Sequence, residues 1–149
     1  MFGAVNTVVI NVGRLLEVRI GAGYAGASEV ADLFAEMARL IHRLPDSVRA
    51  VAVTDWRACR LMSSEAAEAI VTHLVRNNPH IERSAGLAST DSPSAHLQFS
   101  RVIRETGNPD RRLFTDARML EQWLGEVLSA DERRRLSAFL ERSEEALHP

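Results

Sequence analysis

Two adjacent serines, Ser63 and Ser64, stand directly before a stretch in which apolar residues recur at helical spacing. A hydroxyl group at a helix start can accept a phosphoryl group, because free N–H groups and the helix dipole stabilise the added negative charge. The neighbouring Glu65 and Glu68 oppose such a phosphate by like-charge repulsion. Ser63 and Ser64 are therefore candidate phosphoacceptors. The structural alternative is that Ser63 is an N-cap, which is worth about 1 kcal/mol.

A short polar segment separates these serines from the apolar run at residues 51–53. It contains Asp55, Trp56, Arg57 and Arg60. Tryptophan and arginine are enriched in the hot spots of protein interfaces, so these four residues form a candidate partner surface. The alternative is that Trp56 packs over the edge of a sheet as a core residue.

Three glycines, Gly21, Gly23 and Gly26, match the GxGxxG spacing of a dinucleotide-binding loop. Such a loop joins a strand to a helix, and an acidic residue at the end of the next strand binds the ribose; Asp55 stands at that place. Two features oppose this hypothesis: the strand before the loop has a close hairpin partner, and no catalytic constellation follows. Nucleotide binding remains an alternative.

Several chemistries are excluded or disfavoured by residue type. All 18 basic residues are arginine, so mechanisms that need a lysine ammonium group are excluded. The histidines at 42, 73, 80 and 96 lack the spacing of metal ligands. The single cysteine, Cys59, has basic neighbours that could lower its thiol pKa, but no histidine is assigned to it as a base. We therefore expect a non-enzymatic protein with no catalytic residue, metal or cofactor.

The elements that position these residues alternate along the chain. Apolar and β-branched runs predict strands at residues 7–12, 15–20, 49–54, 83–89 and 112–115. Apolar residues three and four apart predict helices at residues 29–44, 64–77, 93–106 and 120–128. A capping box from Ser129 to Glu132 starts a trailing helix at residues 129–149.

This alternation predicts an α/β fold with one mixed, mainly parallel central sheet of about five strands, covered by helices. Polar residues after a parallel strand lie where open α/β sheets carry their functional groups, which places residues 55–64 at that edge. The trailing helix has an apolar stripe that either covers its own sheet or supports a homo-oligomer.

The order of elements resembles the STAS family of sulphate transporter and anti-sigma factor antagonist domains, and the sporulation-protein-like domains that share its fold. The residues that carry the resemblance are 51–55, 60–67 and 112–116, with Trp123 and Leu124. The resemblance covers roughly residues 5–128. It implies a single STAS-like domain over residues 1–149 with an extra C-terminal helix.

In the anti-sigma factor antagonists, a partner kinase phosphorylates a serine at this helix start, within an Asp-Ser-Ser-Gly-like motif. Residues 62–65 of this chain, Met-Ser-Ser-Glu, keep both serines but lack the aspartate and the glycine. The resemblance thus implies a regulatory protein that is switched at Ser63 or Ser64 and binds a protein partner.

Length and charge bound the remaining possibilities. A chain of 149 residues is most simply one domain, and its net charge of −2 gives no general attraction to nucleic acid. No segment is apolar enough to span a membrane, residues 1–4 start no signal sequence, and the single cysteine fits a reducing compartment. We expect a soluble, cytoplasmic bacterial protein.

Three functional hypotheses follow. The favoured one is a regulatory or scaffolding module that binds a protein partner through residues 55–64. The second is a small-ligand or lipid carrier in which apolar helices open a pocket. The third is a nucleotide-binding protein or enzyme that uses the loop at residues 21–26.

Overall fold

The structure, a computed structural model, describes residues 6–147, and side chains as far as Glu141. Residues 1–4, whose sequence predicts no signal peptide, and residues 148–149 of the expected trailing helix lie outside the described residues. Within residues 6–147, none of the helices combines the length and the apolar character that a membrane crossing requires.

A five-stranded sheet forms the centre of the molecule, with its strands in the spatial order β1-β2-β3-β4-β5. The strands are β1 (Thr7–Ile10), β2 (Leu15–Arg19), β3 (Ala50–Asp55), β4 (Ile81–Leu87) and β5 (Arg111–Phe114). β1 pairs antiparallel with β2, and the other neighbours are parallel. The expected mixed, mainly parallel sheet is therefore confirmed.

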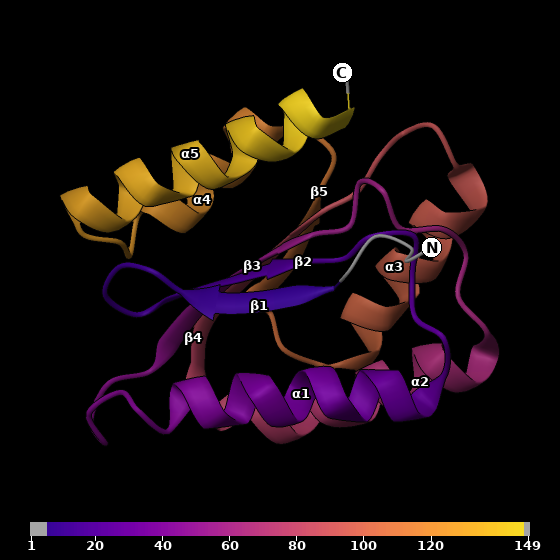
Figure 1. Cartoon of the computed structure of the whole chain (residues 1–149), viewed down its shortest axis with the longest axis horizontal. Coiled ribbons are helices and arrows are strands. Elements are labelled where there is room, and N and C mark those ends of the chain that lie inside the picture. The colour runs from indigo at the N-terminus through magenta and orange to yellow at the C-terminus, as the bar shows by residue number, and fades with distance from the viewer. Residues whose placement is uncertain (1–5, 148–149) are drawn as a thin grey trace.

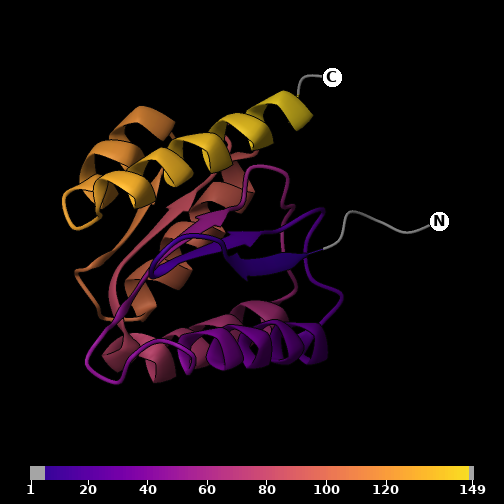
Figure 2. The same ribbon diagram turned by 60° about the vertical axis from the view of Figure 1, so that its left-hand side comes forward.

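Helices cover both faces of this sheet (Figure 1). They are α1 (Ala27–Ile41), α2 (Ser64–Asn77), the short 3-10 helix η1 (Asn78–His80), α3 (Pro93–Glu105), α4 (Ala117–Gly125) and α5 (Ala130–Leu147). The first three α-helices lie on one face and the last two lie on the other, as the turned view shows (Figure 2). The sequence places α4 three residues too late, because Asp116 caps this helix by accepting hydrogen bonds from the N–H groups of Arg118 and Met119.

Alternation along the strands separates two apolar cores. On β3, Ala52 lies in the core beneath α1, α2 and α3, whereas Val51 and Val53 lie in the core beneath α4 and α5. Both cores contain fully buried side chains, so the central strands are buried on both faces. This is the arrangement expected for parallel strands whose crossover helices cover the sheet.

The trailing helix α5 packs against its own sheet. Its apolar residues Leu136, Phe139 and Leu140 are only 1–2% exposed. Arg135 makes two hydrogen bonds of 2.8 Å to the carboxylate of Glu17 on β2, which is itself buried. Of the two roles that the sequence leaves open for this apolar stripe, the structure supports covering of the sheet, and these three side chains are not exposed for self-association.

The start of α5 also fixes the hairpin between β1 and β2. The expected capping box is present, because the Ser129 N–H donates to the Glu132 carboxylate (2.8 Å) and the Glu132 N–H donates to the Ser129 hydroxyl (3.2 Å). The other carboxylate oxygen of Glu132 accepts a 2.8 Å hydrogen bond from the N–H of Arg14. The adjacent Gly13 has a φ of +58°, and a Cβ atom there would lie 2.2 Å from Glu132 Oε2.

We predict that Gly13→Ala lowers the free energy of unfolding by about 2–4 kcal/mol, since it adds left-handed backbone strain and displaces the Glu132 carboxylate. Gly107→Ala is the matched control, because Gly107 has a φ of +65° and no atom within 4 Å of an added Cβ. The control is expected to lose only about 1–2 kcal/mol from backbone strain. Urea unfolding measures both values. Equal losses would show that Glu132 does not constrain the hairpin.

Candidate functional site

The carboxylate of Asp55 ends β3 and is buried, with 6% of the residue exposed. Its Oδ1 atom accepts 3.0 Å hydrogen bonds from the backbone N–H and from Nε of Arg57, and its Oδ2 atom lies 3.6 Å from Nη1 of Arg19. Arg57 also donates from Nη2 to the backbone oxygen of Leu140 on α5 (2.9 Å). Asp55 and Arg57 thus attach α5 to the end of β3.

Trp56 is a core residue with 5% of its surface exposed. Its ring stacks on Phe99 of α3, with centroids 4.8 Å apart, and its Nε1 donates a 3.1 Å hydrogen bond to the hydroxyl of Tyr24. A Cβ atom at Gly86 on β4 would lie 2.9 Å from this indole ring, so the glycine makes room for it.

The exposed partner surface expected at Asp55, Trp56, Arg57 and Arg60 is therefore wrong for its first two members. Asp55 is turned toward α5 and Trp56 toward α3, because successive residues at the end of a strand face opposite sides of the sheet. Arg57 is half-buried, and Arg60 alone of the four is exposed.

Ser63 and Ser64 lie at the start of α2, and both are exposed. The hydroxyl of Ser63 accepts a 3.1 Å hydrogen bond from the N–H of Ala66, so Ser63 is the N-cap of the helix. The capping role expected as the alternative for this serine is confirmed. Phosphorylation of either serine stays a prediction.

The glycine-rich loop follows β2, but its polar contacts are made within the protein. The N–H of Gly21 donates to Asn6 (2.9 Å), and the N–H of Ala25 donates to the carboxylate of Glu29 in the first turn of α1 (2.9 Å). Asn6 also donates to the backbone oxygen of Gly23 (3.0 Å) and to Glu29 (2.7 Å). A carboxylate thus already lies where a dinucleotide fold binds the pyrophosphate, and it would repel one. This geometry does not favour nucleotide binding.

Cys59 is buried in the segment after β3. Burial raises the pKa of its thiol to about 12, so at neutral pH it is protonated and is not an activated nucleophile. The basic neighbours in the sequence do not lower this pKa. Among the described residues, no three His, Cys, Asp or Glu side chains are grouped to bind a metal ion.

A groove of about 190 Å³ lies past the ends of β3 and β4. We call it the edge groove; it is lined by Arg57, Ala58, Cys59, Arg60, Leu61, Ser89, Asp91, Ser92, Ala95 and Phe99. Leu61 at its rim is 60% exposed, and Leu97 on α3 is 70% exposed. The two leucines belong to segments that are joined, because the amide of Gln98 exchanges hydrogen bonds of 2.7 and 2.8 Å with the backbone of Met62.

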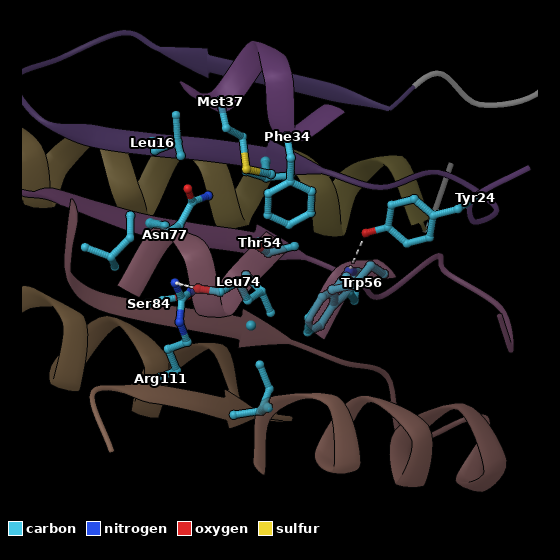
Figure 3. Close-up of a pocket in the computed structure, with 16 residues that line it drawn as sticks. Leu16, Tyr24, Phe34, Met37, Thr54, Trp56, Leu74, Asn77, Ser84 and Arg111 are labelled. Carbon is cyan, nitrogen blue, oxygen red and sulfur yellow. Dashed lines mark hydrogen bonds between the residues drawn. The ribbon is translucent and has the colours of Figure 1, made fainter. Parts of the chain in front are cut away.

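A smaller cavity of about 40 Å³ lies between the sheet and helices α1, α2 and α3 (Figure 3). Its lining is largely apolar, with Arg111, Ser84, Asn77 and Thr54 as polar members. The sequence prediction did not identify these residues as a site. One signal was available, since Arg111 and Leu113 are two positions apart on β5 and must face the same side of the sheet.

Comparison with known proteins shows the fold. No protein-family model matches the chain, and no curated protein matches its sequence. A solved structure that matches is an uncharacterised DUF3478-family protein with a SpoIIAA-like fold from Shewanella loihica PV-4. The TM-score is 0.55 at 14% identity, and the match covers 83% of this chain and 98% of the other. The chain therefore has the SpoIIAA-like, STAS-like fold that the sequence predicts.

The burial of Trp56 leads to a stability prediction. Trp56→Ala is expected to lower the free energy of unfolding by about 3–5 kcal/mol, because it leaves a cavity beside Phe99. Val75→Ala is the control; Val75 is 45% exposed on α2, and its truncation is expected to change stability by no more than about 0.5 kcal/mol. Thermal and urea unfolding measure both. A Trp56→Ala variant as stable as the control would place the indole at the surface.

Proposed function

We propose that the protein is a non-enzymatic regulatory module that binds a protein partner at the edge groove. The observation that carries this proposal is the pair of exposed leucines, Leu61 and Leu97, beside that groove. Single exposed apolar residues are common, but two large ones beside a groove, with an exposed arginine, are typical of a contact surface. The arginine is Arg60. The occupant that fits is a partner segment with apolar side chains and an acidic group.

The groove is held in one conformation by hydrogen bonds within the protein. The N–H of Arg60 donates to the backbone oxygen of Ala22 (3.0 Å), and the N–H of Cys59 donates to that of Trp56 (3.0 Å). Gln98 joins the same segment to α3 at Met62. A preformed surface loses little conformational entropy on binding, which favours its use in recognition.

Ser63 and Ser64 give this surface a means of regulation. They are exposed and follow Leu61 closely in the chain. A phosphate on either one would add negative charge beside the edge groove, and it would repel the acidic group expected in the partner. Phosphorylation thus weakens capture in this proposal. We also propose a cytoplasmic location, which the single free cysteine supports.

The proposal predicts the effect of charge on the two leucines. Leu61→Asp and Leu97→Asp are each expected to weaken partner capture by about 2 kcal/mol, near 30-fold, because a carboxylate replaces an apolar contact and repels the acidic partner. Capture is measured by quantitative mass spectrometry of proteins retained from a lysate of the source organism.

Met119→Asp is the matched control. Met119 is 59% exposed in the first turn of α4, on the opposite face of the sheet, so its change alters charge and exposed apolar area without touching the groove. A protein retained by wild type and by this control, but lost by both leucine variants, is the expected partner. If all variants retain the same proteins, the edge groove is not the binding surface. Sedimentation analysis of the same variants identifies a second copy of the chain as the occupant.

A further inference from the structure

The sheet is lined by small side chains beneath the centre of α1, α2 and α3. β3 presents Ala52 and Thr54 to these helices, and β4 presents Ser84 and Gly86. The helices do not close down on these small residues, and the cavity of about 40 Å³ lies between them. Space of this size holds roughly three water molecules.

One end of this cavity is formed by Arg111, a cation that is buried with only 4% of its surface exposed. Its Nε donates to the side-chain oxygen of Asn78 (2.8 Å), and its Nη2 donates to the backbone oxygen of Leu74 (3.1 Å). Both partners are neutral. Among the described residues, no carboxylate pairs with this guanidinium group.

The charge on Arg111 is only partly offset by its surroundings. Burial lowers its pKa to about 10, which still leaves the guanidinium group charged at neutral pH. Leu74 belongs to the last turn of α2, whose carbonyl end carries a partial negative charge. A buried cation normally has a full anion beside it, because removal from water is costly without one. The cavity is the place where such an anion can lie.

Further polar groups line the cavity without partners in the protein. The hydroxyl of Ser84, a residue that is 8% exposed, makes no hydrogen bond to another described residue, and the same holds for the side chains of Thr54 and Asn77. Ser84 is paired across the sheet with Arg111, so its hydroxyl and the guanidinium group lie at the same end of the cavity (Figure 3). Buried polar groups are normally satisfied, by protein, water or ligand.

We propose that this cavity binds a short-chain carboxylate. The guanidinium group of Arg111 and the hydroxyl of Ser84 donate hydrogen bonds to the carboxylate oxygens, and the amide of Asn77 completes the polar end. The planar guanidinium fork matches the geometry of a carboxylate. The short alkyl chain lies against the apolar lining, toward Phe34 and Met37. This inference concerns a site separate from the edge groove, so it stands or falls independently of the proposed partner binding.

The test uses the fluorescence of Trp56, which lines the cavity. The only other tryptophan, Trp123, lies on α4 beneath the opposite face, and Trp123→Phe removes its signal. Butyrate is expected to give a saturable change in fluorescence in this background. Butyramide, which has the same shape and no charge, is expected to give none at the same concentrations. A missing response to butyrate, or an equal response to butyramide, would overturn the proposal.

Variants then assign the response to the cavity. Ser84→Ala removes a single hydroxyl, and it is expected to weaken butyrate binding about tenfold because a hydrogen bond to a charged group is lost. Thr72→Ala removes an exposed hydroxyl on the outer side of α2 and is the control with unchanged binding. Unchanged binding in Ser84→Ala would contradict the assigned site.

Arg111→Lys keeps the positive charge but loses the planar fork, so about tenfold weaker binding is expected. Its melting temperature is measured alongside; Ser84→Ala decides the case if the lysine variant does not fold. A chain-length series separates a small free acid from a lipid. Affinity that falls beyond butyrate is expected from the small space, and affinity that keeps rising through octanoate would overturn the short-chain assignment.

Discussion

The structure depends on burial of the central sheet on both faces. β3 and β4 have fully buried apolar residues on each side, so helices must cover both surfaces and every polar group within must find a partner. On the side of α4 and α5 this requirement is met by arginine. Arg135 pairs with the buried Glu17, and Arg57 joins Asp55 to the backbone of α5. The last helix is consequently an integral layer of the fold.

The opposite face meets the same requirement less completely. Beneath α1, α2 and α3 the polar groups of Ser84, Thr54 and Asn77 have no partners among the described residues, and Arg111 has only neutral ones. The contrast is between two arginines that are buried close to the sheet: Arg57 has its carboxylate within the chain, and Arg111 does not. This difference is the reason to assign a ligand to the second face.

Local sequence patterns were sufficient to predict the fold. Strand and helix periodicity predicted the order of elements, and the capping residues Ser63 and Ser129 were identified because their partners lie three residues away. The start of α4 was missed, although Asp116 is a cap of the same kind. The exact depth of these elements in the fold follows from packing, which local patterns do not contain.

The candidate sites depend on contacts between residues that are far apart in the chain. Trp56 is buried because Gly86 leaves room for its ring and Phe99 stacks on it. No pattern near Trp56 predicts either contact, so its exposure could not be decided from the sequence. The cavity likewise combines small residues of two strands with the side chain of Arg111 from a third. Arg111 looks like any surface arginine until β5 is placed beside β4.

The central claim is that the face beneath α1, α2 and α3 contains a cationic cavity that an anion completes. A high-resolution crystal structure of the protein grown with butyrate tests it most directly. The account predicts electron density for a carboxylate whose oxygen atoms lie about 2.8 Å from the guanidinium nitrogens of Arg111, with the hydroxyl of Ser84 also in contact. An Arg111 side chain turned out to solvent, or a cavity closed by Phe34 and Met37 with no density at Ser84, would contradict it.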